Sequence, residues 1–267
     1  MSFKLALNAG HGLYTAGKRC MKSIDPNETR EWTLNNRICD KIEAKLKEYE
    51  GYELIRLDDA TGAKDVSLKT RTTKANEFKA DFYLSIHHNA GINGGKGGGV
   101  VAYTYTTPTA VEKDWQSALY YAVVDRTGLR GNRSRPLSAK DLHECRESKM
   151  PCVLLECGFM DSTTDTPIIL TETFAENVAN ACVEVLVKKA NLKKKKKEET
   201  KPKVVYFPKY TGTSRSIIDG LKSVGAESSY TYRKSVAAVN SIAGYKGTSS
   251  QNTAMLKLLK QGKLIKT

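Results

Sequence analysis

The stretch SIHHNAG at residues 85–91 decides how the rest of the chain is interpreted. It ends an apolar run from Ala80 to Ile86, broken only by Asp81, that is typical of a buried strand. The glycine-rich segment GINGGKGGG follows at once. Imidazole is the commonest protein ligand for zinc, so a strand that delivers His87 and His88 to a glycine loop is a candidate metal site. One histidine alone could equally be a core or surface residue, and other residues must therefore reach this loop.

Strands and helices alternate on both sides of this stretch. Apolar runs predict strands at residues 3–8, 52–57, 81–87, 100–105 and 152–156. Helical spacing predicts helices at residues 66–79, 111–124 and 166–189, and one that Asn27 could cap and that ends near Glu48. This alternation predicts an α/β fold with a mostly parallel sheet.

Four residues with suitable chemistry lie at or near the ends of these strands, namely His11, Glu31, His87 and Glu156. Because the carboxyl ends of parallel strands meet at one edge of a sheet, we expect the four side chains to lie together. Two imidazoles and one carboxylate make a three-ligand zinc site with a position open for water. A second carboxylate beside that water would be its general base.

Other interpretations of these residues remain open. Glu31 could interact with the helix dipole, and Glu28 competes with it as a ligand. Glu156 lies between apolar residues, where a charged carboxylate needs a cation or hydrogen-bond donors. His88 is expected on the opposite face of the strand, either supporting the site or at the surface, and His143 has no assigned role.

The composition is that of a globular chain, with 40% hydrophobic and 27% charged residues. No apolar run approaches the ~20 residues of a membrane span, and no secretory signal is visible. The six cysteines show no CxxC spacing and are expected to be reduced thiols.

The net charge of +14 belongs to the C-terminal part of the chain. Residues 1–187 carry 24 Lys and Arg against 25 Asp and Glu, whereas residues 200–267 carry 12 against 2. An anionic partner or a solubility role is implied, and nucleic acid, anionic lipid and wall polymer are all compatible with the charge alone.

The C-terminal part divides into a basic linker at residues 190–203 and a small module at residues 204–267. Tyr210-Thr-Gly-Thr-Ser214 recurs as Tyr245-Lys-Gly-Thr-Ser249, and Leu-Lys follows each copy at the same offset. We expect the Thr/Ser pair to cap a short helix in each of two similar halves that share one core.

The motifs LNAGHG, EWTLNN, RTTKAN, SIHHNAG and MPCVLLECGFMDS resemble, in this order, those of the zinc-dependent N-acetylmuramoyl-L-alanine amidases of phage endolysins and bacterial autolysins. The resemblance covers about residues 3–187, and we assign residues 1–189 to a catalytic domain. It implies a twisted mixed sheet flanked by helices, with His11, Glu31 and His87 as Zn²⁺ ligands. It also implies Glu156 as the catalytic acid/base and favours Glu31 over Glu28, because Asn35 follows Glu31 at the family's helix offset.

The implied activity is hydrolysis, by zinc-activated water, of the amide between N-acetylmuramic acid and L-alanine in peptidoglycan. The C-terminal module resembles the wall-binding module of Bacillus-type phage amidases. This second resemblance implies binding to peptidoglycan and wall polymers of a Gram-positive host and disfavours nucleic acid. With no signal visible, we expect an endolysin that is made in the host cytoplasm and acts on the cell wall after release. A sporulation autolysin freed by lysis of the mother cell would have the same sequence features.

Two other functions remain compatible with the residues. A zinc metallopeptidase acting on wall peptides could use the same ligands and general base, and a wall-binding protein could carry an inactive site.

Overall fold

The computed structural model describes residues 2–195 and 204–267, and residues 196–203 of the expected linker lie outside the described residues. The chain divides into two compact units, Met1–Lys196 and Lys197–Thr267, which we call the first and the second unit. The first unit has an α/β fold, whereas the second is helical.

A mixed sheet of six strands forms the centre of the first unit, in the order β3-β1-β4-β7-β5-β6. All neighbouring strands are parallel except β5 and β7, which are antiparallel. The strands are β1 Phe3–Ala9, β3 Tyr52–Arg56, β4 Phe82–Asn89, β5 Val101–Thr104, β6 Leu137–Ala139 and β7 Cys152–Phe159. A separate two-stranded sheet pairs β2 (Tyr49–Glu50) with β8 (Lys193–Lys194). The expected fold, a mostly parallel mixed sheet flanked by helices, is confirmed.

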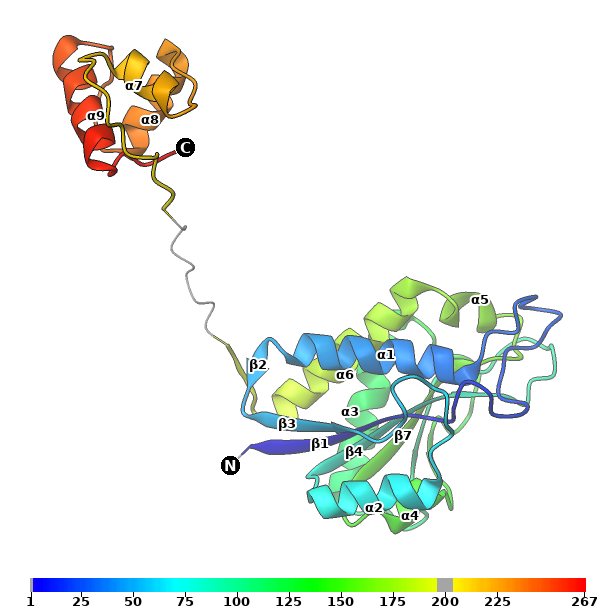
Figure 1. The fold of residues 1–267 in the computed structure, drawn as a ribbon. Coiled ribbons are helices and arrows are strands. Elements are labelled where there is room, and N and C mark those ends of the chain that lie inside the picture. Colours follow the sequence, from blue (N-terminus) through cyan, green and yellow to red (C-terminus); the bar gives the residue numbers. More distant parts are fainter. Residues whose placement is uncertain (1, 196–203) are drawn as a thin grey trace. The chain divides into compact units, whose positions relative to one another are not determined.

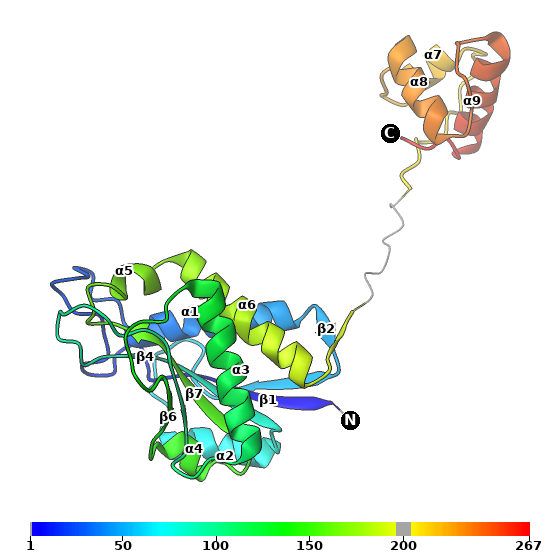
Figure 2. The ribbon, with the colours of Figure 1, turned by 180° about the vertical axis from the view of Figure 1, so that it is seen from behind.

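Helices cover both faces of the sheet, as Figures 1 and 2 show. On one face lie α1 (Glu31–Leu46), α3 (Ala110–Thr127) and α6 (Glu172–Lys189), and on the other lie α2 (Leu68–Phe78) and α4 (His143–Glu147). Alternate side chains of β4 point to the two faces of the sheet, because successive side chains on a strand point to opposite sides. Phe82, Leu84 and Ile86 pack in the larger core under α1, α3 and α6. Tyr83, Ser85 and His87 therefore point to the side of α2 and α4.

Several helix boundaries have a clear local cause. Ser67 caps α2, and Thr171 caps α6. Thr109 and Glu112 form a capping box at the start of α3, and Gly128 ends that helix in a left-handed conformation.

Some expected boundaries are wrong. Asn27 does not cap α1, which begins at Glu31 after Arg30, because Asp25 accepts the backbone N–H groups of Asn27 and Thr29 in a preceding turn. The helix expected at residues 166–189 is two helices, α5 (Thr166–Ile169) and α6. The short elements β2, β6 and α4 were not expected. Lys193–Lys194, expected in the linker, pairs with Tyr49–Glu50.

The second unit contains α7 (Ile217–Ser223), α8 (Tyr230–Val239) and α9 (Ser249–Gln261) around one hydrophobic core. Both copies of the repeat contribute to this core through Tyr210 and Leu221 in the first and Tyr245 and Leu256 in the second. The core residues are Phe207, Tyr210, Ile217, Leu221, Val236, Ala237, Tyr245, Met255, Leu256, Leu259 and Leu264.

The two copies of the repeat differ in how their helices begin. Thr248 caps α9, as expected, with Gln251 completing a capping box. In the first copy the expectation is wrong, because α7 starts later and Ser216 is its cap. There Ser214 Oγ accepts the backbone N–H of Ser216 and donates to Asp219.

All six cysteines lie in the first unit, and each is buried with a free thiol. Among the described residues, no helix is both long enough and apolar enough to cross a membrane.

Candidate metal centre

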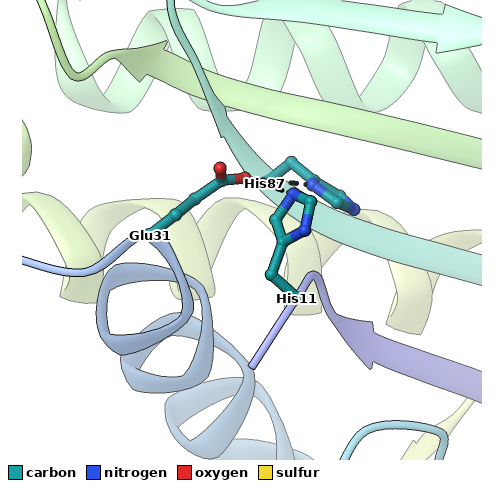
Figure 3. Close-up of side chains that lie close together, drawn as sticks. All are labelled: His11, Glu31 and His87. Carbon is teal, nitrogen blue, oxygen red and sulfur yellow. Dashed lines mark hydrogen bonds and ion pairs between the residues drawn. The ribbon is translucent and has the colours of Figure 1, made fainter. Parts of the chain in front are cut away.

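His11, Glu31 and His87 come from three separate parts of the first unit and point toward one another, as Figure 3 shows. His87 lies near the end of β4, His11 follows β1, and Glu31 is the first residue of α1. The backbone of His11 adopts a φ of 67°, a left-handed conformation that is uncommon for a residue with a side chain. This turn after β1 directs the ring toward Glu31.

One carboxylate oxygen is the shared point of the cluster. Glu31 Oε1 lies 3.1 Å from His87 Nδ1 and 3.4 Å from His11 Nε2. The His11 and His87 rings meet edge to face, with centroids 5.0 Å apart. One potential ligand atom from each residue lies within 4.8 Å of the other two, so the three side chains can bind a single ion together. Glu28, the competing candidate, instead pairs with Arg19 at 3.2 Å.

The electrostatics of the cluster depend on burial and on these contacts. Burial by itself would raise the pKa of Glu31, but the two histidines outweigh it and hold that pKa well below its usual range. Burial would lower the pKa of His87, but the nearby carboxylates of Glu144 and Glu31 raise it to about 10. Glu31 is therefore an anion in a site where burial would otherwise favour the neutral acid.

Glu156 of β7 lies beside this cluster. It is the register partner of His87 across the parallel β4–β7 pair, so both side chains leave the same face of the sheet. Its Oε2 atom is buried without a hydrogen-bond partner, and burial raises the pKa of Glu156 to about 7. An unpaired carboxyl group with a pKa near neutrality is suited to accept and return a proton.

Arg71 fixes the loop that carries His11. This α2 residue is 1% exposed and donates to the carbonyl oxygens of Ala9 at 2.7 Å and His11 at 2.9 Å. It also donates to Asn8 Oδ1 and contacts Asp65 at 3.3 Å. The arginine of the RTTKAN motif thus holds the backbone on both sides of Gly10.

Gly10 itself is required by the position of the His87 ring. A Cβ atom added at Gly10 would collide with three atoms of that imidazole. The glycine is needed here for space, since only a residue without a side chain lets the ring of β4 pack against the end of β1.

His88 lies on the opposite side of the strand and is 2% exposed, so the alternative of a surface position is wrong. Its Nδ1 atom lies 2.8 Å from Asn35 Oδ1, and the amide nitrogen of Asn35 donates to the carbonyl of Gly10. Burial lowers the pKa of His88 to about 3, which keeps the ring neutral. His88 therefore supports the loop after β1 through Asn35. His143, the other unassigned histidine, lies beside Thr72, 3.4 Å from its hydroxyl.

Glu144 was not identified from the sequence. It is 2% exposed on α4, and its carboxylate accepts hydrogen bonds from Asn8, Tyr83 and Ser85. Its Oε2 atom lies 3.6 Å from His87 Nε2. The available signal was the polar alternation of Tyr83, Ser85 and His87 along β4, which points to a polar partner on the α2 and α4 side.

A cavity of about 310 Å³ opens onto this cluster. Its lining includes His11, His87, Glu144 and Arg71, together with the start of α2. A second hollow of about 390 Å³ is lined by Val101, Arg133 and Arg135 among others. Val101 is the register partner of Glu156 on the neighbouring strand, so this hollow lies next to Glu156 along the sheet.

The residues of the cluster fit a Zn²⁺ ion. The donor set of two imidazole nitrogens and a carboxylate oxygen is one that zinc uses in catalytic sites, with one position left for water. Glu31 Oε2 and, beside the cluster, Glu156 Oε2 are buried and lack hydrogen-bond partners. Buried polar atoms are normally satisfied, so their concentration here indicates that the site is built to hold a further group.

Comparison with known proteins agrees with this geometry. Residues 5–188 match the family described as N-acetylmuramoyl-L-alanine amidase. The chain belongs to this family. It is therefore a hydrolase of the N-acetylmuramoyl-L-alanine amidase type, which confirms the predicted class of peptidoglycan hydrolase.

Individual relatives extend this finding. The chain is 32% identical over 192 residues to the sporulation-specific N-acetylmuramoyl-L-alanine amidase of Bacillus subtilis, covering 72% of this chain and 69% of that protein. It is 32% identical over 209 residues to the endolysin of Bacillus phage SPP1, covering 76% and 73%. The crystal structure of an N-acetylmuramoyl-L-alanine amidase from Clostridium difficile 630 is similar with a TM-score of 0.63 and 25% identity, covering 71% of this chain and 97% of that one.

Proposed function

We propose that the first unit hydrolyses the amide bond between N-acetylmuramic acid and the L-alanine of the stem peptide in peptidoglycan, with Zn²⁺ held by His11, Glu31 and His87. The observation that carries this proposal is the convergence of the three side chains on Glu31 Oε1. When bound, Zn²⁺ would polarise the scissile carbonyl and lower the pKa of a water molecule.

Glu156 would supply the proton transfers. In this proposal its carboxylate takes a proton from the attacking water and then returns it to the departing amino group of L-alanine. Two features support the assignment, namely its register position opposite His87 and the burial that raises its pKa to about 7. Arg71, Gly10 and Asn35 would act by holding the loop of His11 and the ring of His87 in place.

The second unit would retain the enzyme on its substrate. We propose that residues 204–267 bind wall polymers of a Gram-positive host, as an endolysin released onto the cell wall requires. Residues 200–267 carry 12 Lys and Arg against 2 Asp and Glu, which favours an anionic polymer. A second binding site on one chain raises the effective concentration of the catalytic unit at the wall.

Product analysis on purified peptidoglycan tests the reaction. We expect new free amino groups on L-alanine and no new amino groups on other stem residues. Chelation is expected to abolish hydrolysis, and Zn²⁺ is expected to restore it. New amino groups within the stem would instead indicate a metallopeptidase, and hydrolysis that resists chelation would contradict the metal assignment.

Retention on washed walls tests the second unit. The full chain and a chain ending at residue 195 are compared for cosedimentation with walls and for cleavage of a small soluble substrate. We expect the shorter chain to lose cosedimentation and keep cleavage. Equal cosedimentation of both chains would refute the wall-binding assignment. A preference for DNA over walls at equal salt would favour nucleic acid.

A further inference from the structure

Glu144 is held by several hydrogen bonds next to the Nε2 atom of His87. Its Oε1 atom accepts hydrogen bonds from Asn8 Nδ2 and Tyr83 Oη, both at 2.7 Å, and its Oε2 atom accepts one from Ser85 Oγ at 3.2 Å. Asn8 is fixed in turn by Arg71, which donates to its side-chain oxygen. Three donors on one carboxylate leave it little freedom to rotate, so its Oε2 atom stays directed at the His87 ring.

The His87 ring lies between two carboxylates. Its Nδ1 atom is 3.1 Å from Glu31 Oε1, the carboxylate oxygen on which His11 and His87 converge. Its Nε2 atom is 3.6 Å from Glu144 Oε2 and has no hydrogen-bond partner. The nearest group that could accept a proton from Nε2 is therefore Glu144, within reach after a small rotation of the ring.

This arrangement bears on which nitrogen of His87 carries the proton. A neutral imidazole has one N–H group and one lone pair, and an ionised carboxylate can only accept hydrogen bonds. Glu144 therefore favours a proton on Nε2. Glu31, also ionised and 3.1 Å from Nδ1, favours a second proton there in the absence of an ion, and an ion held by His11 and Glu31 would replace that second proton, so that the lone pair of Nδ1 faces the ion. Carboxylates that hold a metal-binding histidine in this way also make it a stronger ligand.

We propose that Glu144 is a positioning residue that holds His87 as the Nε2–H tautomer, so that Nδ1 is the ring nitrogen offered to the metal. This inference rests on the proposed role of His87 as a ligand. Glu144 is not itself part of the group of potential ligands found among the described residues, which consists of His11, Glu31 and His87.

The substitution Glu144→Gln separates positioning from a merely structural role. The glutamine oxygen can still accept from Asn8 and Tyr83, so the main hydrogen bonds of the site are kept. Its NH₂ group then faces Ser85 and His87 Nε2, where a donor favours the lone pair on Nε2 and moves the ring proton to Nδ1. The wrong tautomer is thus obtained with little loss of packing.

The affinity of the full chain for Zn²⁺, measured by competition with a chromophoric chelator, tests this. We expect Glu144→Gln to bind Zn²⁺ about 10- to 100-fold more weakly, with a similar melting temperature in the absence of metal. Tyr83→Phe is the matched control, because it removes one donor to the same carboxylate but leaves the charge, and we expect it to retain most of the affinity. Equal affinity of Glu144→Gln and the unsubstituted chain would overturn the inference.

A second measurement needs no variant and decides the question even if Glu144→Gln fails to fold. Long-range ¹H–¹⁵N NMR spectra of the ¹⁵N-histidine chain loaded with ¹¹³Cd²⁺ report which His87 nitrogen couples to the metal. Coupling to Nδ1 with a proton on Nε2 is expected, and coupling to Nε2 would overturn the inference. An unsubstituted chain that binds neither Zn²⁺ nor Cd²⁺ would refute the proposed function instead.

Discussion

Glu156 and His87 are directly opposite each other on adjacent parallel strands, β7 and β4. A ring assigned to metal binding and a carboxyl group assigned to proton transfer are therefore held at a separation set by the sheet. Both strands lie inside the sheet, with β1 on one side of the pair and β5 on the other. Strands and helices fix catalytic geometry better than loops do. This placement therefore favours separate roles for the two residues, metal binding for His87 and proton transfer for Glu156.

Glu156→Gln is expected to separate hydrolysis from metal binding. The glutamine amide cannot accept the proton of water, so we expect hydrolysis of peptidoglycan to fall by about 10²- to 10⁴-fold. The affinity for Zn²⁺ should be nearly unchanged, because the three clustered ligand atoms belong to other residues. Turbidity loss of wall suspensions and chelator competition measure the two properties. Glu184→Gln, at an exposed ion pair with Arg126, is the control. Unchanged lysis by Glu156→Gln would remove the assigned role.

Gly10→Ala is expected to displace the His87 ring. The backbone of Gly10 is not left-handed, so alanine brings no conformational strain, and the whole effect comes from the collision of Cβ with the imidazole. We expect the affinity for Zn²⁺ to fall by at least tenfold, which corresponds to about 1.4 kcal/mol of binding free energy.

Gly128→Ala is the matched control for that substitution. Gly128 has a φ of 70°, and a Cβ atom added there would meet open space, so alanine is strained at this position but touches nothing. We expect it to lower stability by about 1 kcal/mol and to leave Zn²⁺ affinity unaltered. If both variants weaken binding equally, the cause is general destabilisation and the steric argument for Gly10 is wrong.

Most of the fold and the three clustered side chains could be predicted from the sequence for a common reason. The expected strands are short, mainly apolar runs, and the carboxyl ends of parallel strands meet at one edge of the sheet. This rule places His11 and His87, whereas Glu31, at the start of α1, is preferred over Glu28 only through the resemblance to the amidase family. The antiparallel direction of β5 could not be predicted in this way, because the periodicity of a strand carries no direction.

Glu144 could not be identified because the necessary relationship is tertiary. Helix α4 has five residues, too few for a helical period to be visible. The run from Ala80 to Ile86 also hides the fact that Tyr83 and Ser85 face a different layer from Leu84 and Ile86. Only the packing of α4 against β4 and β7 shows that a carboxylate lies beside His87.

Arg71→Lys is expected to lower both stability and metal affinity. Lysine keeps the charge but offers its donors from one point, whereas Arg71 reaches the carbonyls of Val66, Ala9 and His11 from three different nitrogens. At least one buried carbonyl loses its donor, so we expect a loss of about 1–3 kcal/mol in the free energy of unfolding. Denaturant titration and chelator competition measure the two effects. Arg126→Lys at the exposed pair with Glu184 should change neither, and an Arg71→Lys chain with normal Zn²⁺ affinity would show that the loop of His11 is held by other contacts.

Removal of the metal is expected to destabilise the first unit alone. A ligand that binds only the folded state adds about 4 kcal/mol of stability at a thousandfold excess over its dissociation constant. For a unit of this size that corresponds to a rise of roughly 8–16 °C in melting temperature. The second unit has its own hydrophobic core, and none of the potential ligands found among the described residues lies in it. Calorimetry of the full chain should therefore resolve one transition that shifts with Zn²⁺ and one that does not.

Glu31→Gln provides the control for this shift, since the neutral amide replaces the carboxylate on which both histidines converge. Its two transitions should stay in place when Zn²⁺ is added. A Zn²⁺-dependent shift of the second transition would mean that the ion binds outside the cluster, because the folded second unit would then have to contain a site. A shift of the first transition that persists in Glu31→Gln would show that His11 and His87 hold the ion without the carboxylate.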